Sequence, residues 1–270
     1  MHLYRQLSDL NMSLFDSEQL VKACSLIKNY LEDSLMAIHL YGSAVEGGLK
    51  PYSDIDLFVT IDRPMTDDVR LELMQALLAY SAIPGAESST RALEVTVVNY
   101  QDVVPWKYPP RRQMQFGEWL REDILAGVVE PALTDIDLCI LIKKLRTVSV
   151  PIVGPDASLF FEPVPEGDFL RTLKSTLDIW NTEEDWLGDE RNVILTIARI
   201  WFSASAGEIA SKEDASSWLI SHLPRAYQSL VAQARQQYLI GEKGELTLDP
   251  KEVLAFINFA KQSIRSILLT

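Results

Sequence analysis

The pattern of apolar residues changes along the chain, and this change limits the possible folds more than any other feature. In the first half, helical and strand-like spacing alternate over 16–33, 36–42, 56–61, 66–80 and 91–100. The run 56–61 (DLFVTI) is apolar on both faces, as in a strand that is covered on both sides. Beyond Gly154 the strand-like runs disappear and helical periodicity takes over. The sequence therefore predicts an α/β domain followed by an all-α helical bundle.

The boundary between these parts is expected where proline and glycine concentrate, in SVPIVGPDASLFFEPVPEGD (149–168). We expect a first domain over 1–160 and a second over 161–270. A cleft between two domains is a common place for a ligand.

Composition excludes several classes of protein. Cys24 and Cys139 are far apart in apolar stretches, and with three histidines they offer neither a disulfide framework nor a zinc-type spacing. No window approaches the roughly 18 apolar residues of a membrane span, and the N-terminus has no secretory pattern. The net charge of −13 should repel phosphate backbones and favour cationic ligands. We therefore expect a cytoplasmic protein with neither a membrane nor a nucleic acid as its partner.

The string Asp-Ile-Asp-Leu occurs twice, in SDIDL (53–57) and in TDIDL (134–138). In a strand, residues i and i+2 point to the same face, so Asp54 and Asp56 would present two carboxylates side by side. The second copy has the pattern of a helix that begins near Thr134, where acids in the first turn complement the helix dipole. The first copy is therefore a candidate cation site and the second is not.

Two further features surround the first copy. Gly42 and Ser43 follow a strand and precede a short helical turn, whose backbone N–H groups could hold a phosphate. Glu94 is a lone carboxylate in the apolar run RALEVTVV. Two of the three carboxylates can hold Mg²⁺ on a nucleoside triphosphate, and the third can complete the metal shell or accept the proton of an attacking hydroxyl.

The combination of Gly-Ser, ten residues, Asp-x-Asp and a later isolated Glu resembles the nucleotidyltransferase superfamily related to DNA polymerase β. The resemblance to the aminoglycoside (3'')(9)-O-adenylyltransferases, which confer resistance to streptomycin and spectinomycin, is closer. It is carried by HLYGSAVEGGLKPYSDIDLFVT, ALEVTVV, QFGEWLREDILAG, GDERNVILT and ARIWFS. It runs from about Leu35 to Tyr238, while residues 1–12 look like an extension, with Met12 as an alternative start.

The resemblance implies a polymerase β-like mixed sheet and adenylyl transfer from ATP to a hydroxyl of either antibiotic, with release of pyrophosphate. Asp54, Asp56 and Glu94 would form the Mg²⁺ site, and Glu94 would also be the catalytic base. The implied nucleotide contacts are Gly42, Ser43, Ser53, Asp137, Arg199, Lys212 and Tyr238.

The drug contacts implied by the same resemblance are Trp119, Trp180, Asp185 and Asp189. Carboxylates and aromatic faces suit the guanidinium and amine groups of these drugs. For Trp119 the alternative is an aromatic residue that anchors a helix. Glu183 and Glu184 are expected on a solvated face, and Trp186, Trp201 and Trp218 in packing.

Other functions share part of this pattern. A nucleotidyltransferase that acts on RNA ends would have the same core, but the acidic composition counts against it. A regulatory nucleotidyltransferase module would typically lack the long helical part, and a drug-binding protein without activity would release no pyrophosphate. We expect a monomeric enzyme.

Overall fold

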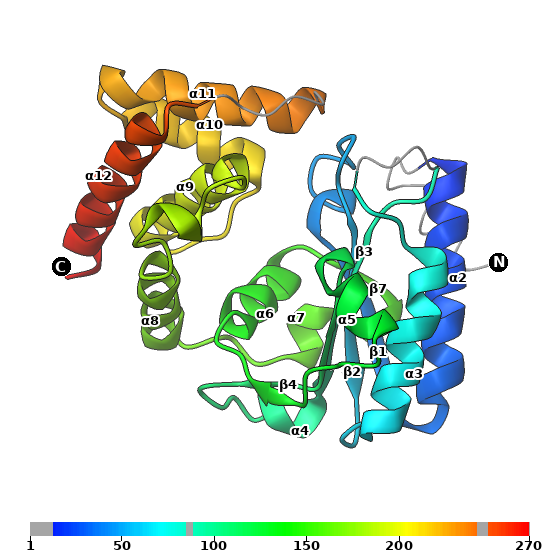
Figure 1. The fold of residues 1–270 in the computed structure, drawn as a ribbon. Helices are drawn as coiled ribbons and strands as arrows, with labels where there is room; N and C mark the ends of the chain where they lie inside the picture. Colours follow the sequence, from blue (N-terminus) through cyan, green and yellow to red (C-terminus); the bar gives the residue numbers. More distant parts are fainter. Residues whose placement is uncertain (1–12, 85–88, 242–247, 270) are drawn as a thin grey trace. The chain divides into compact units, whose positions relative to one another are not determined.

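The computed structural model describes residues 13–84, 89–241 and 248–269, so the extension expected over 1–12 lies outside the described residues. The chain divides into two compact units, Met1–Val164 and Pro165–Thr270 (Figure 1). The division falls within the Pro- and Gly-rich segment 149–168. No helix in the described segments is long and apolar enough to cross a membrane.

The first unit is built on a mixed five-stranded sheet with the strand order β5-β3-β2-β1-β7. Strands β2 and β3 run parallel, and the other neighbours are antiparallel. The strands are β1 (Leu35–Tyr41), β2 (Ile55–Ile61), β3 (Leu93–Asn99), β5 (Met114–Phe116) and β7 (Val150–Val153). A second, two-stranded sheet pairs β4 (Arg111–Arg112) with β6 (Leu133–Thr134).

One face of the large sheet carries the core of this unit. Helices α2 (Leu14–Leu31) and α3 (Asp67–Leu77) lie along it (Figure 1). Each begins at a capping hydroxyl, since the side chains of Ser13 and Thr66 accept hydrogen bonds from the first turns. Alternate strand residues such as Ile38, Leu57 and Val95 are fully buried in this core. The period of two therefore sends the intervening residues of β1, β2 and β3 to the opposite face.

That opposite face is partly covered by α7 (Ala157–Phe160) and the residue after it. The ring of Phe58 meets the ring of Phe161 edge-on at 5.8 Å, and His39 Nε2 lies 2.9 Å from the carbonyl oxygen of Pro155. Burial lowers the pKa of His39. The midsection of this face is therefore filled, and its two carboxylate residues, Asp56 and Glu94, lie toward the C-terminal end of β1.

The predicted helix start near Thr134 was wrong. Thr134 pairs with Arg111 in the small sheet, and helix α6 (Leu138–Thr147) begins four residues later without an acid in its first turn. Asp135 instead forms an ion pair with Arg112 at 2.9 Å and accepts a hydrogen bond from the backbone N–H of Asp137. The strand pairing of Thr134 and the ion pair of Asp135 therefore keep these two residues out of the helix, which follows a turn at Ile136 and Asp137.

The second unit is helical, as predicted. Its central helix, α9 (Glu190–Ala206), contacts the other long helices and buries Ile194, Leu195 and Ile197 completely. The other helices are α8 (Glu166–Leu177), α10 (Lys212–His222), α11 (Arg225–Ile240) and α12 (Pro250–Leu268), with the short η6 (Glu183–Asp185).

Sequence signals located the helix ends of this unit well. Gly207 ends α9 in the left-handed conformation, Ser211 accepts a hydrogen bond from Asp214 N at 3.0 Å, and Pro250 opens α12 after the cap Asp249. The expected packing roles are also confirmed: Trp186 is 1% exposed, Trp201 packs on Phe259, and Trp218 packs on Phe202 and His222.

Candidate active site

Three neighbouring strands place one polar residue each in a single row. Tyr41 at the end of β1 is paired with Asp56 near the start of β2, and Asp56 is paired with Glu94 near the start of β3. Burial raises the pKa of Tyr41 well above its usual value, and the charges of Glu94, Asp56 and Asp54 raise it further. The structure thus places Asp56 and Glu94 in the same row as one buried phenol.

The backbone at Gly42 leaves room for the carboxylate of Asp56. Gly42 has φ +72°, and a Cβ atom there would lie 1.8 Å from Asp56 Oδ2. Gly42 also starts the short turn η3 (Gly42–Ala44), in which the N–H groups of Val45 and Glu46 donate to its carbonyl oxygen. Only a residue without a side chain lets the turn that carries Ser43 approach Asp56 so closely.

The turn before Asp54 is held by an arginine that sequence reasoning did not single out. Lys50 N donates to Ser53 Oγ at 2.9 Å, and Ser53 N donates back to the Lys50 carbonyl oxygen. Arg91 Nη1 donates to the carbonyl oxygens of Lys50 and Ser53, at 2.8 and 3.1 Å, and Arg91 Nε pairs with Asp16 at 2.7 Å. No sequence signal reveals this role, because the partners are distant along the chain.

Glu94 contacts a residue of the neighbouring strand. Gln115 Nε2, on β5, donates a hydrogen bond to Glu94 Oε1 at 3.1 Å. Gln115 is a second residue that the sequence did not point to.

Asp137 lies at the start of α6 and is exposed as a residue. Partial desolvation of its carboxyl group raises its pKa. The negative charge of Asp135 raises this pKa further, and the positive charge of Arg112 lowers it. Helix α6 is also tied to the turn after Ser43, because Lys144 Nζ forms an ion pair with Glu46 at 2.8 Å.

Trp119 is 61% exposed and belongs to η5 (Glu118–Leu120). Its ring lies over Gly117, where an added Cβ would meet it at 2.2 Å. The side chain is therefore not a buried helix anchor. It presents an aromatic surface to the solvent.

The second unit brings two of the predicted nucleotide contacts together. Lys212 Nζ, at the start of α10, lies 5.5 Å from the centre of the Tyr238 ring on α11. Arg199 lies on α9 and donates to Thr196 Oγ1 at 3.4 Å.

The predicted drug contacts in the second unit differ in exposure. Trp180 is 9% exposed, and its carbonyl oxygen accepts a hydrogen bond from Lys261. Asp185 and Asp189 are exposed. Hydrogen bonds from the N–H groups of Thr182 and Asn181 lower the pKa of Asp185, while Asp189 Oδ1 accepts from Asn192 at 2.6 Å. Both acids are therefore held at the surface as acceptors.

In the segments 13–84, 89–241 and 248–269, no group of three or more His, Cys, Asp or Glu side chains lies close enough together to hold a metal ion. Any cation near Asp54 and Asp56 would need ligands beyond the protein carboxylates.

Two family models match the chain: a nucleotidyltransferase domain over residues 24–117, and an aminoglycoside adenylyltransferase C-terminal domain over residues 159–263. An aminoglycoside (3'') (9) adenylyltransferase of Escherichia coli is 48% identical over 93% of this chain and 95% of its own length. A spectinomycin 9-adenylyltransferase of Campylobacter jejuni is 32% identical over 94% of this chain and 97% of its own length.

Among solved structures, a spectinomycin adenyltransferase from Enterococcus faecialis with ATP and spectinomycin is similar to this chain. The TM-score is 0.86 at 28% identity, over 93% of this chain and 99% of that one. These matches confirm the nucleotidyltransferase fold followed by a helical domain.

The Arg91–Asp16 pair gives a first prediction. Arg91→Met should lower the free energy of unfolding by about 3 kcal/mol, because it leaves the buried carboxylate of Asp16 unpaired. Adding Asp16→Asn should restore part of the loss. Urea unfolding measures both.

The matched control is Arg63→Met, which breaks an exposed pair with Asp62 and should cost less than about 1 kcal/mol. Equal losses of unfolding free energy in Arg91→Met and Arg63→Met would show that Arg91 does not stabilise the turn before Asp54 through a buried ion pair.

Proposed function

Because the chain belongs to the aminoglycoside (3'')(9) adenylyltransferase family, we propose that it transfers AMP from ATP to a hydroxyl of streptomycin (3'') and of spectinomycin (9). Pyrophosphate is released and the antibiotic is inactivated. The observation that carries the proposal is the row Tyr41–Asp56–Glu94 beside the turn at Gly42. This row places one carboxylate that can bind a cation and one that can accept a proton next to a turn whose backbone can hold phosphates.

We assign the Mg²⁺ ligands to Asp54 and Asp56. Mg²⁺ prefers hard oxygen donors and is usually bound through one or two carboxylates together with substrate phosphates. Two protein carboxylates therefore fit this ion. Glu94, expected as a third ligand, is left out of the metal site, because in the described residues no three such side chains lie close enough together to hold a metal ion. The close approach of Asp56 to Gly42 keeps its carboxylate beside the phosphate turn. When bound, the ion supplies charge neutralisation on the phosphates.

Glu94 is the general base in this proposal. It accepts the proton of the drug hydroxyl as that oxygen attacks the α-phosphorus in line with the leaving pyrophosphate. The buried phenol of Tyr41 stays neutral and so adds no further charge to the site. Most of the rate enhancement then comes from positioning and charge neutralisation.

The remaining nucleotide contacts are assigned residue by residue. Gly42, Ser43 and Ser53 line the phosphates, and Arg199 and Lys212 supply positive charge for the triphosphate. We assign Asp137 to the adenine side and Tyr238 to the nucleotide. The proximity of Lys212 to the Tyr238 ring supports the assignment of Tyr238.

The drug contacts are Trp119, Trp180, Asp185 and Asp189. The exposed ring of Trp119 and the two exposed acids suit guanidinium and amine groups. Trp180 is nearly buried, so it would contribute an edge of its ring or act by supporting its neighbours.

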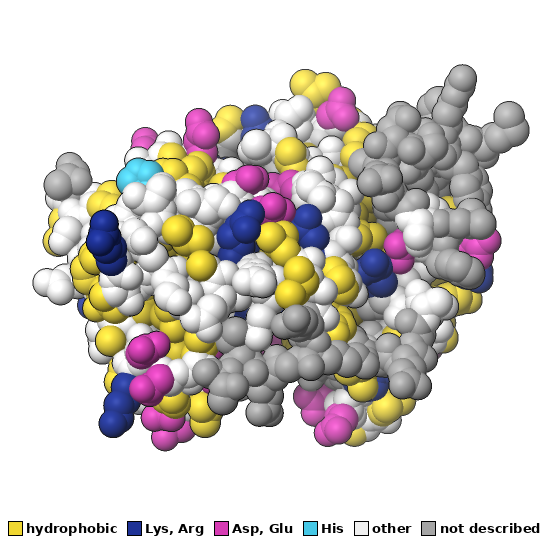
Figure 2. Space-filling view, turned by 90° about the horizontal axis from the view of Figure 1, so that it is seen from above, with side chains coloured by type: hydrophobic (Ala, Val, Ile, Leu, Met, Phe, Trp, Pro, Cys, Tyr) yellow, Lys and Arg dark blue, Asp and Glu magenta, His cyan; other side chains and the backbone are white. Residues whose placement is uncertain are grey.

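We further propose that the units over about 1–160 and 161–270 act as a nucleotidyltransferase domain and a helical domain of a cytoplasmic monomer. Both cysteines are free and buried, which suits a reducing compartment. Nucleic acid is not a proposed partner. The net charge is −13, and basic side chains lie among acidic and apolar ones on the face in Figure 2.

The direct test is pyrophosphate release from Mg-ATP with streptomycin, with spectinomycin and without drug. We expect release with each drug and little without. Glu94→Gln should keep the fold and ATP binding, because Gln can still accept from Gln115, and should lower turnover about 10²–10⁴-fold.

Near-normal turnover of Glu94→Gln would remove this residue from the role of base. If the wild-type protein releases no pyrophosphate with either drug, the acceptor is another molecule or the protein has a regulatory binding role.

The close contact at Gly42 gives a third prediction. Gly42→Ala should abolish most turnover, because its Cβ displaces the Asp56 carboxylate, and should also cost about 1–2 kcal/mol of stability at this φ. Gly47→Ala is the control: its φ is +73°, but the nearest atom to an added Cβ is 3.9 Å away. It should lose similar stability and keep its turnover, as measured by urea unfolding and pyrophosphate release. Equal activities of the two variants would show that the close approach of Gly42 to the Asp56 carboxylate is not needed for turnover.

A fourth prediction concerns the drug surface. Trp119→Ala should raise the KM for streptomycin about 2- to 30-fold, the range of a cation–π contact. Asp189→Asn should act in the same direction and keep its hydrogen bond to Asn192. Steady-state kinetics with both drugs measures the effect, and Glu183→Gln on the solvated face is the control. An unchanged KM in both variants would show that these residues do not contact the drug.

A further inference from the structure

Glu94 is held by a side chain from the adjacent strand. Residue 115 of β5 lies directly opposite Thr96 of β3, and Thr96 shares the face of Glu94 two residues along the same strand. Gln115 reaches back along this face and donates from Nε2 to Glu94 Oε1 at 3.1 Å. One oxygen of the carboxylate is thereby engaged by a neutral amide.

The orientation of this amide is determined by its other contacts. Gln115 Oε1 accepts from Arg112 Nη1 at 3.0 Å and from Thr96 Oγ1 at 3.1 Å. A guanidinium group has only donors, so the side of the amide that faces Arg112 must be the oxygen. The NH₂ group must then face Glu94, which makes it a donor to the carboxylate.

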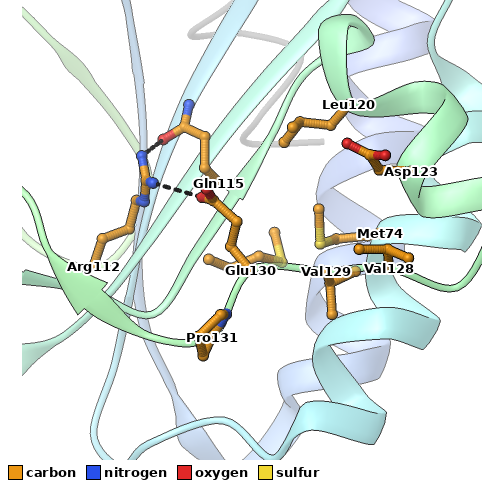
Figure 3. Close-up of a pocket in the computed structure, with 10 residues that line it drawn as sticks. Met74, Arg112, Gln115, Leu120, Asp123, Val128, Val129, Glu130 and Pro131 are labelled. Carbon is orange, nitrogen blue, oxygen red and sulfur yellow. Dashed lines mark hydrogen bonds and ion pairs between the residues drawn. The ribbon is translucent and has the colours of Figure 1, made fainter.

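Arg112 is held in turn by two acids. Its Nη1 lies 2.9 Å from Asp135 Oδ2 and its Nη2 lies 3.2 Å from Glu130 Oε2. Figure 3 shows the contacts of Arg112 with Gln115 and with Glu130, beside a small pocket that these residues line. The side chains of Arg112 and Asp135 are only 16% and 14% exposed, so solvent screens their attraction less than at the surface.

We propose that Gln115 is a positioning residue for the base Glu94, and that Arg112, anchored by Asp135 of the second Asp-Ile-Asp-Leu string, fixes the amide of Gln115. The chain of contacts sets the direction of the Glu94 carboxylate before substrate binds. The inference rests on the proposed role of Glu94.

The test is a double-mutant cycle on pyrophosphate release from Mg-ATP and spectinomycin. Gln115→Met keeps the length of the side chain and removes the donor. It should lower kcat about 10- to 100-fold, the usual range for a lost hydrogen bond to a charged group, with the KM for ATP changed less than about 2-fold. In the Glu94→Gln background, where no base remains to be positioned, Gln115→Met should change kcat less than about 2-fold.

Gln113→Met is the matched control. Gln113 lies two residues away, is 3% exposed, and makes the same kind of contact with another carboxylate, since its Nε2 donates to Asp102 Oδ2 at 2.9 Å. It should lose stability as Gln115→Met does and leave kcat near the wild-type value. Thermal unfolding of both variants checks that they fold.

If Gln115→Met does not fold, Gln115→Glu is the variant to measure in its place. A glutamate can still accept from Arg112 and Thr96, but it turns an oxygen toward Glu94 and should lower kcat at least as much.

Equal losses of kcat from Gln115→Met with and without Glu94, or an equal loss from Gln113→Met, would overturn the positioning role. Full turnover of Glu94→Gln alone would instead refute the base itself, so the two failures are distinguishable.

Discussion

The candidate site depends on the register between β2 and β3. This parallel pairing sets Asp56 opposite Glu94, and the antiparallel pairing on the other side sets Tyr41 opposite Asp56. A slip of one residue in β3 would turn Glu94 toward α2 and α3 and move apolar residues out of that core. The burial of Leu93, Val95 and Val97 on the core face therefore also determines where the carboxylate of Glu94 points.

Two arginines support the site in addition to the pairing of the strands. Arg91 links the turn before Asp54 to Asp16 on α2, and Arg112 links Gln115 to Asp135 before α6. Each is mostly buried and paired with an acid that is also mostly buried. Catalytic groups need supporting contacts of this kind, because small displacements of a base or a metal ligand lower the rate strongly.

Sequence patterns located the elements and the carboxylates of the site, but not their supports. Asp54 and Asp56 were identified from an Asp-x-Asp string at the head of a strand, and Glu94 because a carboxylate in an apolar strand is conspicuous. Gln115 and Arg112 lie in a short polar segment, and apart from their contact with each other their partners Glu94, Glu130 and Asp135 are 18 or more residues away. The string TDIDL was misread for a related reason: its local pattern favours a helix from Thr134, but Thr134 pairs with Arg111 and Asp135 with Arg112, and the helix starts only at Leu138.

The sequence by itself determined the order of an α/β part and a helical part, the ends of the helices at Gly207, Ser211 and Pro250, and the three carboxylates that carry the proposed chemistry. These follow from local physics: apolar periodicity, capping and the cost of a charge in a buried strand. Only the tertiary structure decided that Gly42 lies against Asp56, that Trp119 is exposed, and that the second Asp-Ile-Asp-Leu string supports Glu94 through Arg112 and Gln115. Those contacts join segments far apart in the chain, and their geometry is set by how the strands pair.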